Sequence, residues 1–205
     1  MCTRFYIMPE TEEFKEIIAA VKESPLFHKF IDAGKPVLTS GEIRPTDVAP
    51  VLASNREGLK TVFPMKWGFQ LPGRSPLVNA RSETAAEKPT FKEAWAKHRC
   101  ITPASWYYEW EHFVSSSGLK KTGAKYMIQP RDSQMAWLCG LYRIEDGLPA
   151  FTVLTREPSN ELRRIHDRMP LLLPEEKIGE WIDPTNRPEV LVPYSLTDMV
   201  FEKTK

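Results

Sequence analysis

Eighteen prolines are spread along the 205 residues of this chain, and they limit how far any helix or strand can run. Proline has no backbone N–H to donate, so it is excluded from helix interiors and from the middle of a sheet. Between the prolines, short apolar runs broken by turns follow one another over much of the chain. The pattern predicts a compact, β-rich α+β fold with short flanking helices rather than a regular α/β sandwich.

Length and composition fit one domain over residues 1–205, with 41% hydrophobic residues for its core, although two small domains would also fit. The net charge of +1 names no partner, so a nucleic-acid surface would need local clusters of arginine and lysine. Three cysteines are too few for a disulfide framework and suit a reducing compartment. Because we find neither a signal peptide nor a membrane-spanning apolar run, we expect a soluble, cytoplasmic protein that contacts no membrane.

Apolar periodicity and turn residues predict the individual elements. The expected strands are Arg4–Met8, Ala49–Ala53, Thr61–Trp67, Arg99–Thr102, Trp106–Phe113, Lys125–Gln129, Met135–Tyr142 and Ala150–Thr155. The expected helices follow the N-caps Thr11 and Ser24, span Pro89–Lys97, run from a cap at Ser159 or Asn160 through Arg164, and extend from Pro174 to near Trp181. Glu145-Asp146-Gly147 predicts a hairpin turn, and Val114–Ala124 a long hairpin tip.

Cys2 directly follows the initiator methionine. If Met1 is removed, the new terminus carries an α-amine and a thiol two carbons apart. Such an amine can condense with an aldehyde to a Schiff base, and the thiol can then close onto the imine carbon to form a thiazolidine ring. An internal cysteine cannot do this because its nitrogen belongs to a peptide bond. A cysteine at this position is often incidental, so its interpretation depends on the motifs downstream.

Two polar motifs occur at expected strand ends. In Asn79-Ala80-Arg81-Ser82-Glu83-Thr84, an amide beside a guanidinium suits the positioning of a phosphate or another polar ligand, although the same residues form ordinary turns. Met65-Lys66-Trp67-Gly68-Phe69 is followed by Arg74. Trp67 could belong to the core, but its basic neighbours favour an exposed platform on which a base stacks.

Glu109 lies inside the aromatic run Trp106-Tyr107-Tyr108-Glu109-Trp110. Strand alternation places it on the face of Tyr107. A carboxyl group among aromatic residues loses water, and desolvation raises its pKa towards the range of a general acid or base. The alternative is an edge strand with Glu109 facing solvent.

His166 lies in the tight polar motif Ile165-His166-Asp167-Arg168-Met169-Pro170, at an expected transition from helix to strand. Histidine titrates near physiological pH and is a frequent general acid or base. The other three histidines, His28, His98 and His112, have ordinary helical or hairpin surroundings and are interpreted as surface residues. No Cys/His spacing completes a metal site, and no glycine loop for phosphates or nucleophile elbow is present, so we expect neither metal nor cofactor.

Taken together, these segments resemble the SRAP family, the SOS-response-associated peptidases or abasic-site shielding proteins. The matching motifs occur in the family's order along nearly the whole chain: Met1-Cys2-x-Arg4, Met65-x-Trp67-Gly68, Asn79–Thr84, Arg99-Cys100-x-x-Pro103-Ala104, Tyr108-Glu109-Trp110 and His166–Pro170. The resemblance implies a single SRAP-like domain of mixed antiparallel sheets or a distorted barrel, with a positively charged groove for single-stranded DNA.

The resemblance also implies a function for the terminus. Cys2, once Met1 is gone, would link covalently to the ring-opened aldehyde of an abasic site, with Asn79, Glu109 and His166 as its active-site companions. The expected partner is single-stranded DNA containing abasic sites, and the expected state is a monomer. The implied or expected DNA contacts are Arg4, Trp67, Arg81, Lys66, Arg74 and Arg168.

Two other functions remain open at this stage. One is an N-terminal-nucleophile cysteine peptidase or amidohydrolase, in which the Cys2 thiol attacks an amide and its own amine serves as the base, including self-removal of Met1. The other is a DNA-binding module without chemistry. The first needs the same free terminus as the crosslinking function, so the sequence separates the two poorly.

Overall fold

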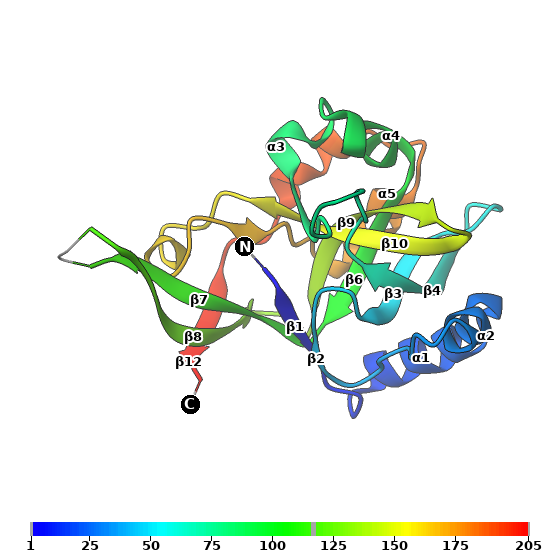
Figure 1. The fold of residues 1–205 in the computed structure, drawn as a ribbon, viewed down its shortest axis with the longest axis horizontal. Helices are drawn as coiled ribbons and strands as arrows, with labels where there is room; N and C mark the ends of the chain where they lie inside the picture. The colour runs from blue at the N-terminus through cyan, green and yellow to red at the C-terminus, as the bar shows by residue number, and fades with distance from the viewer. Residues whose placement is uncertain (1, 116–117, 205) are drawn as a thin grey trace.

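The computed structural model describes residues 2–115 and 118–204. The predicted removal of Met1 and the centre of the predicted hairpin tip lie outside these residues. Within them, two β-sheets and several short helices account for most of the chain (Figure 1).

Five strands close into a barrel. They are β3 (Val48–Ser54), β4 (Lys60–Trp67), β6 (Arg99–Ala104), β9 (Ala136–Glu145) and β10 (Leu148–Arg156). Pairing runs β10–β4–β3–β6–β9, and β9 returns to β10. All of these contacts are antiparallel except the one between β10 and β4. Strand β10 also pairs with the short strands β5 (Asn79–Arg81) and β11 (Met169–Pro170). Because β5 begins the Asn79 motif and β11 ends the His166 motif, β10 holds both motifs against the barrel.

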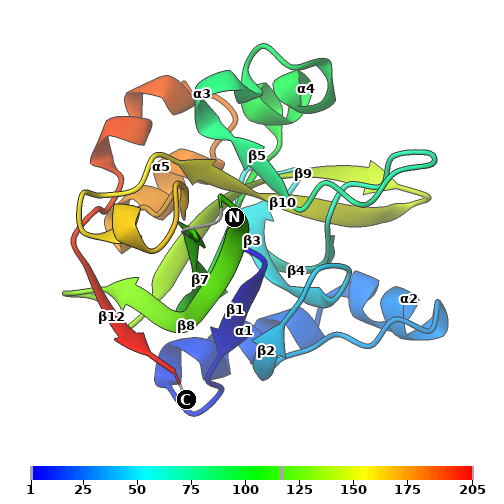
Figure 2. The ribbon, with the colours of Figure 1, turned by 60° about the vertical axis from the view of Figure 1, so that its left-hand side comes forward.

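The second sheet is antiparallel throughout and has the order β12-β8-β7-β1-β2 (Figure 2). Its strands are β1 (Arg4–Ile7), β2 (Gly41–Ile43), β7 (Trp106–Val114), β8 (Lys120–Pro130) and β12 (Met199–Lys203). The hairpin of β7 and β8 projects away from the barrel (Figure 1). This sheet therefore brings the start of the chain beside the strand that carries Glu109.

Short helices cover the barrel. They are α1 (Glu12–Lys22), α2 (Pro25–Asp32), α3 (Ser82–Ala85), α4 (Pro89–Lys97) and α5 (Ile178–Ile182), with 3-10 turns η1 (Leu162–Arg164), η2 (Glu175–Lys177), η3 (Pro188–Val190) and η4 (Val192–Tyr194). Helices α1 and α2 contact β4, whereas α4 contacts β9 and α5 contacts β6. Thr11 and Ser24 accept hydrogen bonds from Phe14 and Leu26, which confirms both predicted N-caps.

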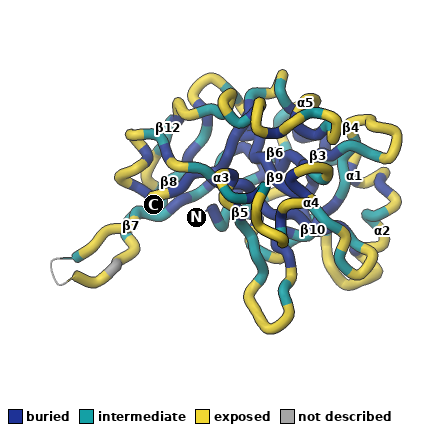
Figure 3. Tube along the Cα trace, turned by 90° about the horizontal axis from the view of Figure 1, so that it is seen from above, coloured by how far each residue is buried: buried dark blue, intermediate teal, exposed yellow. Residues whose placement is uncertain are grey.

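The buried residues of the core come from strands of both sheets, and the buried segments gather in the middle of the molecule in Figure 3. The predicted compact, β-rich α+β fold is confirmed. The predicted hairpin turn is also confirmed: Asp146 and Gly147 have φ of 51° and 77°, as a two-residue turn between β9 and β10 requires. Among the described helices, none combines the length and the apolar character needed to cross a membrane.

Candidate active site around Cys2

Strand β1 sets the position of Cys2. Its register with β7 pairs Arg4 with Tyr108, so the residues before Arg4 run towards the middle of β7. Cys2 is completely buried, and its thiol donates to the Arg4 carbonyl at 3.7 Å. Burial raises the pKa of the thiol, and the negative charge of Glu109 raises it further. The thiol is therefore protonated at neutral pH.

Asn79 holds the backbone of the cysteine from the other sheet. The parallel pairing of β5 with β10 sets Asn79 opposite Val153, and the start of β1 lies beside β5 (Figures 2 and 3). The Asn79 Nδ2 donates to the Cys2 carbonyl at 2.8 Å. Asn79, at the start of β5, thus holds Cys2 in place.

Glu109 is 3% exposed, on the same face of β7 as the fully buried Tyr107. Burial raises the pKa of its carboxyl group above the ordinary value. The predicted desolvation of Glu109 is confirmed, and the alternative of a solvent-facing edge position is wrong. A buried carboxyl with a raised pKa can both take and return a proton near neutral pH.

His166 follows η1 and faces Glu109. It is 7% exposed, and its Nδ1 lies 3.9 Å from the Glu109 Oε1. Burial lowers its pKa to about 4, so the ring is neutral at physiological pH. The same Nδ1 lies 2.8 Å from the Asp167 Oδ1 and accepts the backbone N–H of Arg168 at 3.0 Å. These two contacts suit different tautomers, because an unprotonated Nδ1 accepts and a protonated one donates.

Arg168 joins the histidine loop to the asparagine motif. Its two terminal nitrogens donate to the two Glu83 carboxylate oxygens at 2.9 and 2.8 Å, and one of them also donates to the Thr155 carbonyl at 2.7 Å. A two-pronged pair of this kind fixes orientation as well as distance. The Arg168 side chain is only 10% exposed, so it connects the His166 loop to Glu83 and Thr155 from a buried position. Its predicted DNA contact stays a prediction.

The other basic residues predicted to contact DNA differ in their exposure and in their ion pairs. Arg81 is exposed at the end of β5, and Arg74 is exposed in the loop before it. Arg4 pairs with Glu42 at 3.2 Å and is 28% exposed, while Lys66 pairs with Glu145 at 3.2 Å. Their contacts with DNA stay predictions, and Arg81 is the one that adjoins the Asn79 strand.

The prediction that Trp67 is an exposed stacking platform is wrong. Trp67 has no exposed surface, and its ring packs against Phe5 and Phe151. Its Nε1 donates to the Val78 carbonyl at 2.9 Å. The alternation of β4 turns this side chain inwards, and burial of a large apolar ring outweighed the cationic neighbours on which the prediction rested.

Sequence reasoning missed His112. It is exposed, as a surface residue should be, yet its ring centroid lies 4.6 Å from that of His166. The pairing of β7 with β8 has a register shift between Trp110 and His112, and this bulge turns His112 towards His166. The backbone N–H of His112 donates to the Ile165 carbonyl. Alternation alone gives no sign of such a bulge. A cavity of about 400 Å³ opens between the β7–β8 hairpin and the histidine loop, lined by His112, Phe113, Val114, Lys121, Thr122, Arg163, His166 and Asp167.

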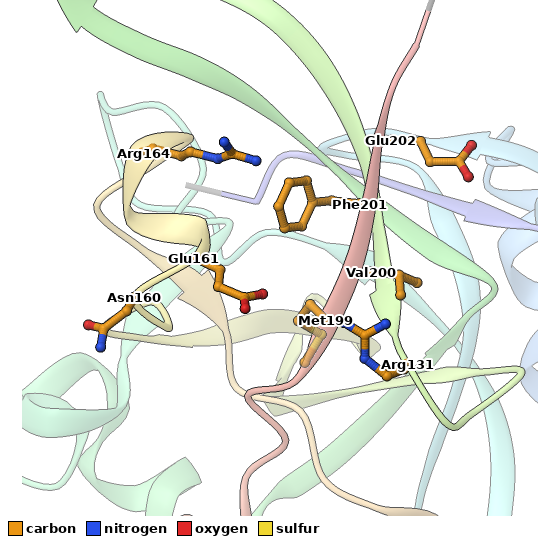
Figure 4. Close-up of a pocket in the computed structure, with 8 residues that line it drawn as sticks. All are labelled: Arg131, Asn160, Glu161, Arg164, Met199, Val200, Phe201 and Glu202. Atoms are coloured by element: carbon orange, nitrogen blue, oxygen red, sulfur yellow. The ribbon is translucent and has the colours of Figure 1, made fainter.

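A roomier cavity of about 680 Å³ lies between η1 and β12 (Figure 4). It is lined by Arg131, Asn160, Glu161, Arg164, Met199, Val200, Phe201 and Glu202. None of Cys2, Asn79, Glu109 and His166 contributes to it, so it does not compete as the site of their chemistry. Within the described residues, no group of three or more His, Cys, Asp or Glu side chains is arranged to hold a metal ion.

A sequence model of the SOS response associated peptidase (SRAP) family matches residues 1–203. The chain belongs to the SRAP family. The resemblance inferred from the ordered motifs is therefore confirmed.

Relatives in this family carry a common name. The abasic site processing protein YoaM of Bacillus subtilis is 33% identical over 78% of this chain and 77% of its own length. The abasic site processing protein YedK of Escherichia coli is 30% identical over 89% of this chain and 79% of its own length. A solved structure of a protein from Bacteroides thetaiotaomicron superposes with a TM-score of 0.72 at 20% identity, covering 100% of this chain and 92% of the other, and therefore has the same fold.

Proposed function

We propose that this protein binds single-stranded DNA and links Cys2 covalently, as a thiazolidine, to the aldehyde of an abasic site. The observation that carries the proposal is a buried carboxyl group, Glu109, whose charge acts on the Cys2 thiol and which lies 3.9 Å from the His166 ring. Relatives named abasic site processing proteins support this class of substrate. The proposal requires that Met1 be removed.

The amine would react first. An α-amine has an ordinary pKa of about 7.7–8.0, so a useful fraction is neutral at cellular pH. The neutral amine attacks the aldehyde carbon, and the carbinolamine loses water to give the imine. The thiol then adds to the imine carbon and its proton goes to the nitrogen. This order suits a buried thiol whose pKa is raised, because the thiol is needed only after the imine has formed beside it.

Glu109 and His166 would move the protons. As the deoxyribose ring opens, the C1′ hydroxyl gives its proton to the Glu109 carboxylate and the ring oxygen takes one from His166. Glu109 then returns its proton to the carbinolamine hydroxyl, which leaves as water. The raised pKa of Glu109 makes its carboxylate a stronger base for the first step and its acid available for the second.

The DNA backbone would lie along the cationic edge of the site. Arg81 is exposed beside Asn79, and Lys121 and Arg163 line the cavity that reaches His166. Phosphate contacts by such side chains release counterions, so noncovalent binding should weaken as salt rises. A net charge of +1 attracts DNA only weakly over long distances. The attraction of the site for phosphates would therefore depend on Arg81, Lys121 and Arg163.

The rival function is an N-terminal-nucleophile peptidase. It needs a thiol that readily gives its proton to the neighbouring amine, and nucleophilic cysteines owe their reactivity to a lowered pKa. Burial and the charge of Glu109 raise the pKa of the Cys2 thiol instead. The chemistry that starts with the amine is therefore favoured over attack by the thiol on an amide.

The test is incubation of purified protein with single-stranded DNA that bears one abasic site, followed by a denaturing gel. Wild type should give a heat-stable shifted band, and Cys2→Ala should not. Cys139→Ala is the matched control, because Cys139 is a second buried, free cysteine that belongs to β9 in the barrel. A wild type without a shifted band, or an equally stable band in Cys2→Ala, would refute the proposal.

A further inference from the structure

Asp167 combines two properties that none of its neighbours in the site shares. Its side chain is 84% exposed, yet its Oδ1 lies 2.8 Å from the Nδ1 of His166, which is 7% exposed. The carboxylate is therefore a direct contact between bulk solvent and a buried imidazole. The proposed chemistry assigns it no part.

Among the described residues, Asp167 and the Arg168 backbone N–H compete for the Nδ1 of His166. When Nδ1 carries the proton, it donates to Asp167 and the other ring nitrogen, Nε2, has a lone pair. When Nδ1 is unprotonated, it accepts the Arg168 backbone N–H and Nε2 carries the proton. Both tautomers are neutral, so the ring can change its role at Nε2 without becoming a buried cation.

We propose that Asp167 is a proton relay and positioning residue that resets the tautomer of His166 from solvent. The inference rests on the proposed function, since it concerns the proton that His166 gives to the opening sugar ring. As Nε2 releases its proton to the ring oxygen, Nδ1 gains one from the Asp167 carboxyl group, which has taken it from a hydronium ion of the solvent. The ring ends as the other neutral tautomer. It is restored when Nε2 takes a new proton from solvent and Nδ1 returns its own through Asp167 to a water molecule.

The other groups that face His166 fit this role. Glu109 approaches at 3.9 Å but is buried, so it exchanges protons with solvent less readily than Asp167. His112 packs ring to ring from β7 at 4.6 Å, and its positive form would lower the pKa of His166 further. Arg168 turns its guanidinium towards Glu83 and donates its backbone N–H to the His166 ring. Asp167 is thus the exposed acceptor in direct contact with the ring.

The kinetic test compares Asp167→Ala and Asp167→Asn with wild type in the rate of crosslinking to abasic single-stranded DNA. Asp132→Ala serves as the matched control, because Asp132 is an exposed aspartate in the turn between β8 and β9. Both Asp167 variants should slow the reaction by about tenfold or more. A positioned proton-transfer group accelerates a reaction by ~10²- to 10⁴-fold, and loss of the relay should remove a part of that acceleration. Added formate, a small carboxylate, should restore much of the rate of Asp167→Ala. An unchanged rate, or a slow rate that formate does not alter, would overturn the relay.

The tautomer can be measured without DNA. In protein with ¹⁵N-labelled histidine, the His166 signals are assigned by their loss in His166→Gln. Wild type should show a substantial population with Nδ1 protonated, and Asp167→Ala should shift it to the form with Nε2 protonated. Identical tautomers in both proteins would refute the assignment to Asp167. If wild type forms no crosslink, the proposed function fails, whereas this comparison still decides whether Asp167 sets the tautomer.

Discussion

The Asn79 side-chain amide donates to the Cys2 carbonyl at 2.8 Å, across the junction of the two sheets. The amide of one sheet thereby positions the terminus of a strand in the other. Because Cys2 directly precedes the short strand β1 and Asn79 opens the short strand β5, this hydrogen bond is a direct tie between the Asn79 motif and Cys2.

Substitution of Asn79 should slow crosslinking in a graded way. A single neutral hydrogen bond contributes about 0.5–1.5 kcal/mol net, so Asn79→Ala should reduce the rate by roughly 2- to 10-fold. Asn79→Asp should be slower still, because a carboxylate oxygen would face the Cys2 carbonyl. Initial rates of gel-shift formation at saturating DNA give the comparison. An Asn79→Asp protein as fast as wild type would show that this contact does not position the cysteine.

The pH profile of crosslinking should rise towards alkaline pH in wild type. Both the amine and Glu109 act in their deprotonated forms, and burial raises the pKa of Glu109 towards that of the amine. Glu109→Gln should be slower by about 10²-fold or more, with a profile that follows the amine alone. Rates measured from pH 5 to 9 make the test. Equal rates in the variant would remove Glu109 from the mechanism.

Glu109 should also cost stability at neutral pH. Its folded pKa is raised, so its favourable contribution is complete below the unfolded pKa and is lost as pH rises through the folded pKa. Glu109→Gln should therefore stabilise the protein at pH 8 relative to wild type, by of order 1 kcal/mol, and less at pH 4. Urea denaturation at the two pH values measures the difference. A variant equally destabilised at both would contradict the raised pKa.

His166 should affect stability in acid with the opposite sign. Its folded pKa is about 4 against an ordinary 6.5, so its contribution is present above pH 6.5 and is lost as pH falls through about 4. Wild type should lose about 1–3 kcal/mol more than His166→Gln between pH 7 and pH 4. His28→Gln, an exposed residue on α2, is the matched control and should behave as wild type. Parallel losses in all three proteins would contradict burial of a neutral ring.

Trp67 should matter for stability rather than for DNA binding. Trp67→Phe keeps an aromatic ring between Phe5 and Phe151 but leaves the buried Val78 carbonyl without its indole donor. The expected loss is about 1–3 kcal/mol in the free energy of unfolding, with DNA affinity at fixed salt unchanged. A fall in affinity at unchanged stability would restore the stacking function for Trp67.

The sequence was most informative where one element determines the outcome by itself. The N-caps Thr11 and Ser24 and the Asp146-Gly147 turn follow from local pattern, whereas the same pattern left the burial of Glu109 open. The order β10–β4–β3–β6–β9 of the barrel strands, and the late strand β12, depend on pairing between distant segments and were not predicted.

Within the site, the companions of Cys2 came from the resemblance of ordered motifs, whereas their contacts came only from the fold. His112 reaches His166 through a bulge, and Arg168 turns inwards because Glu83 on α3 meets it there. Trp67 shows the converse error, since nearby charges do not decide which way a strand side chain faces.

The most direct test is the intact mass of the purified protein before and after reaction with abasic single-stranded DNA. The account predicts a chain that lacks Met1 and begins at Cys2, and a product whose mass is that of this chain plus the DNA minus one water. That product should persist on heating and be absent with Cys2→Ala. A crosslinked product formed by protein that retains Met1, or a linkage at any other residue, would contradict the account.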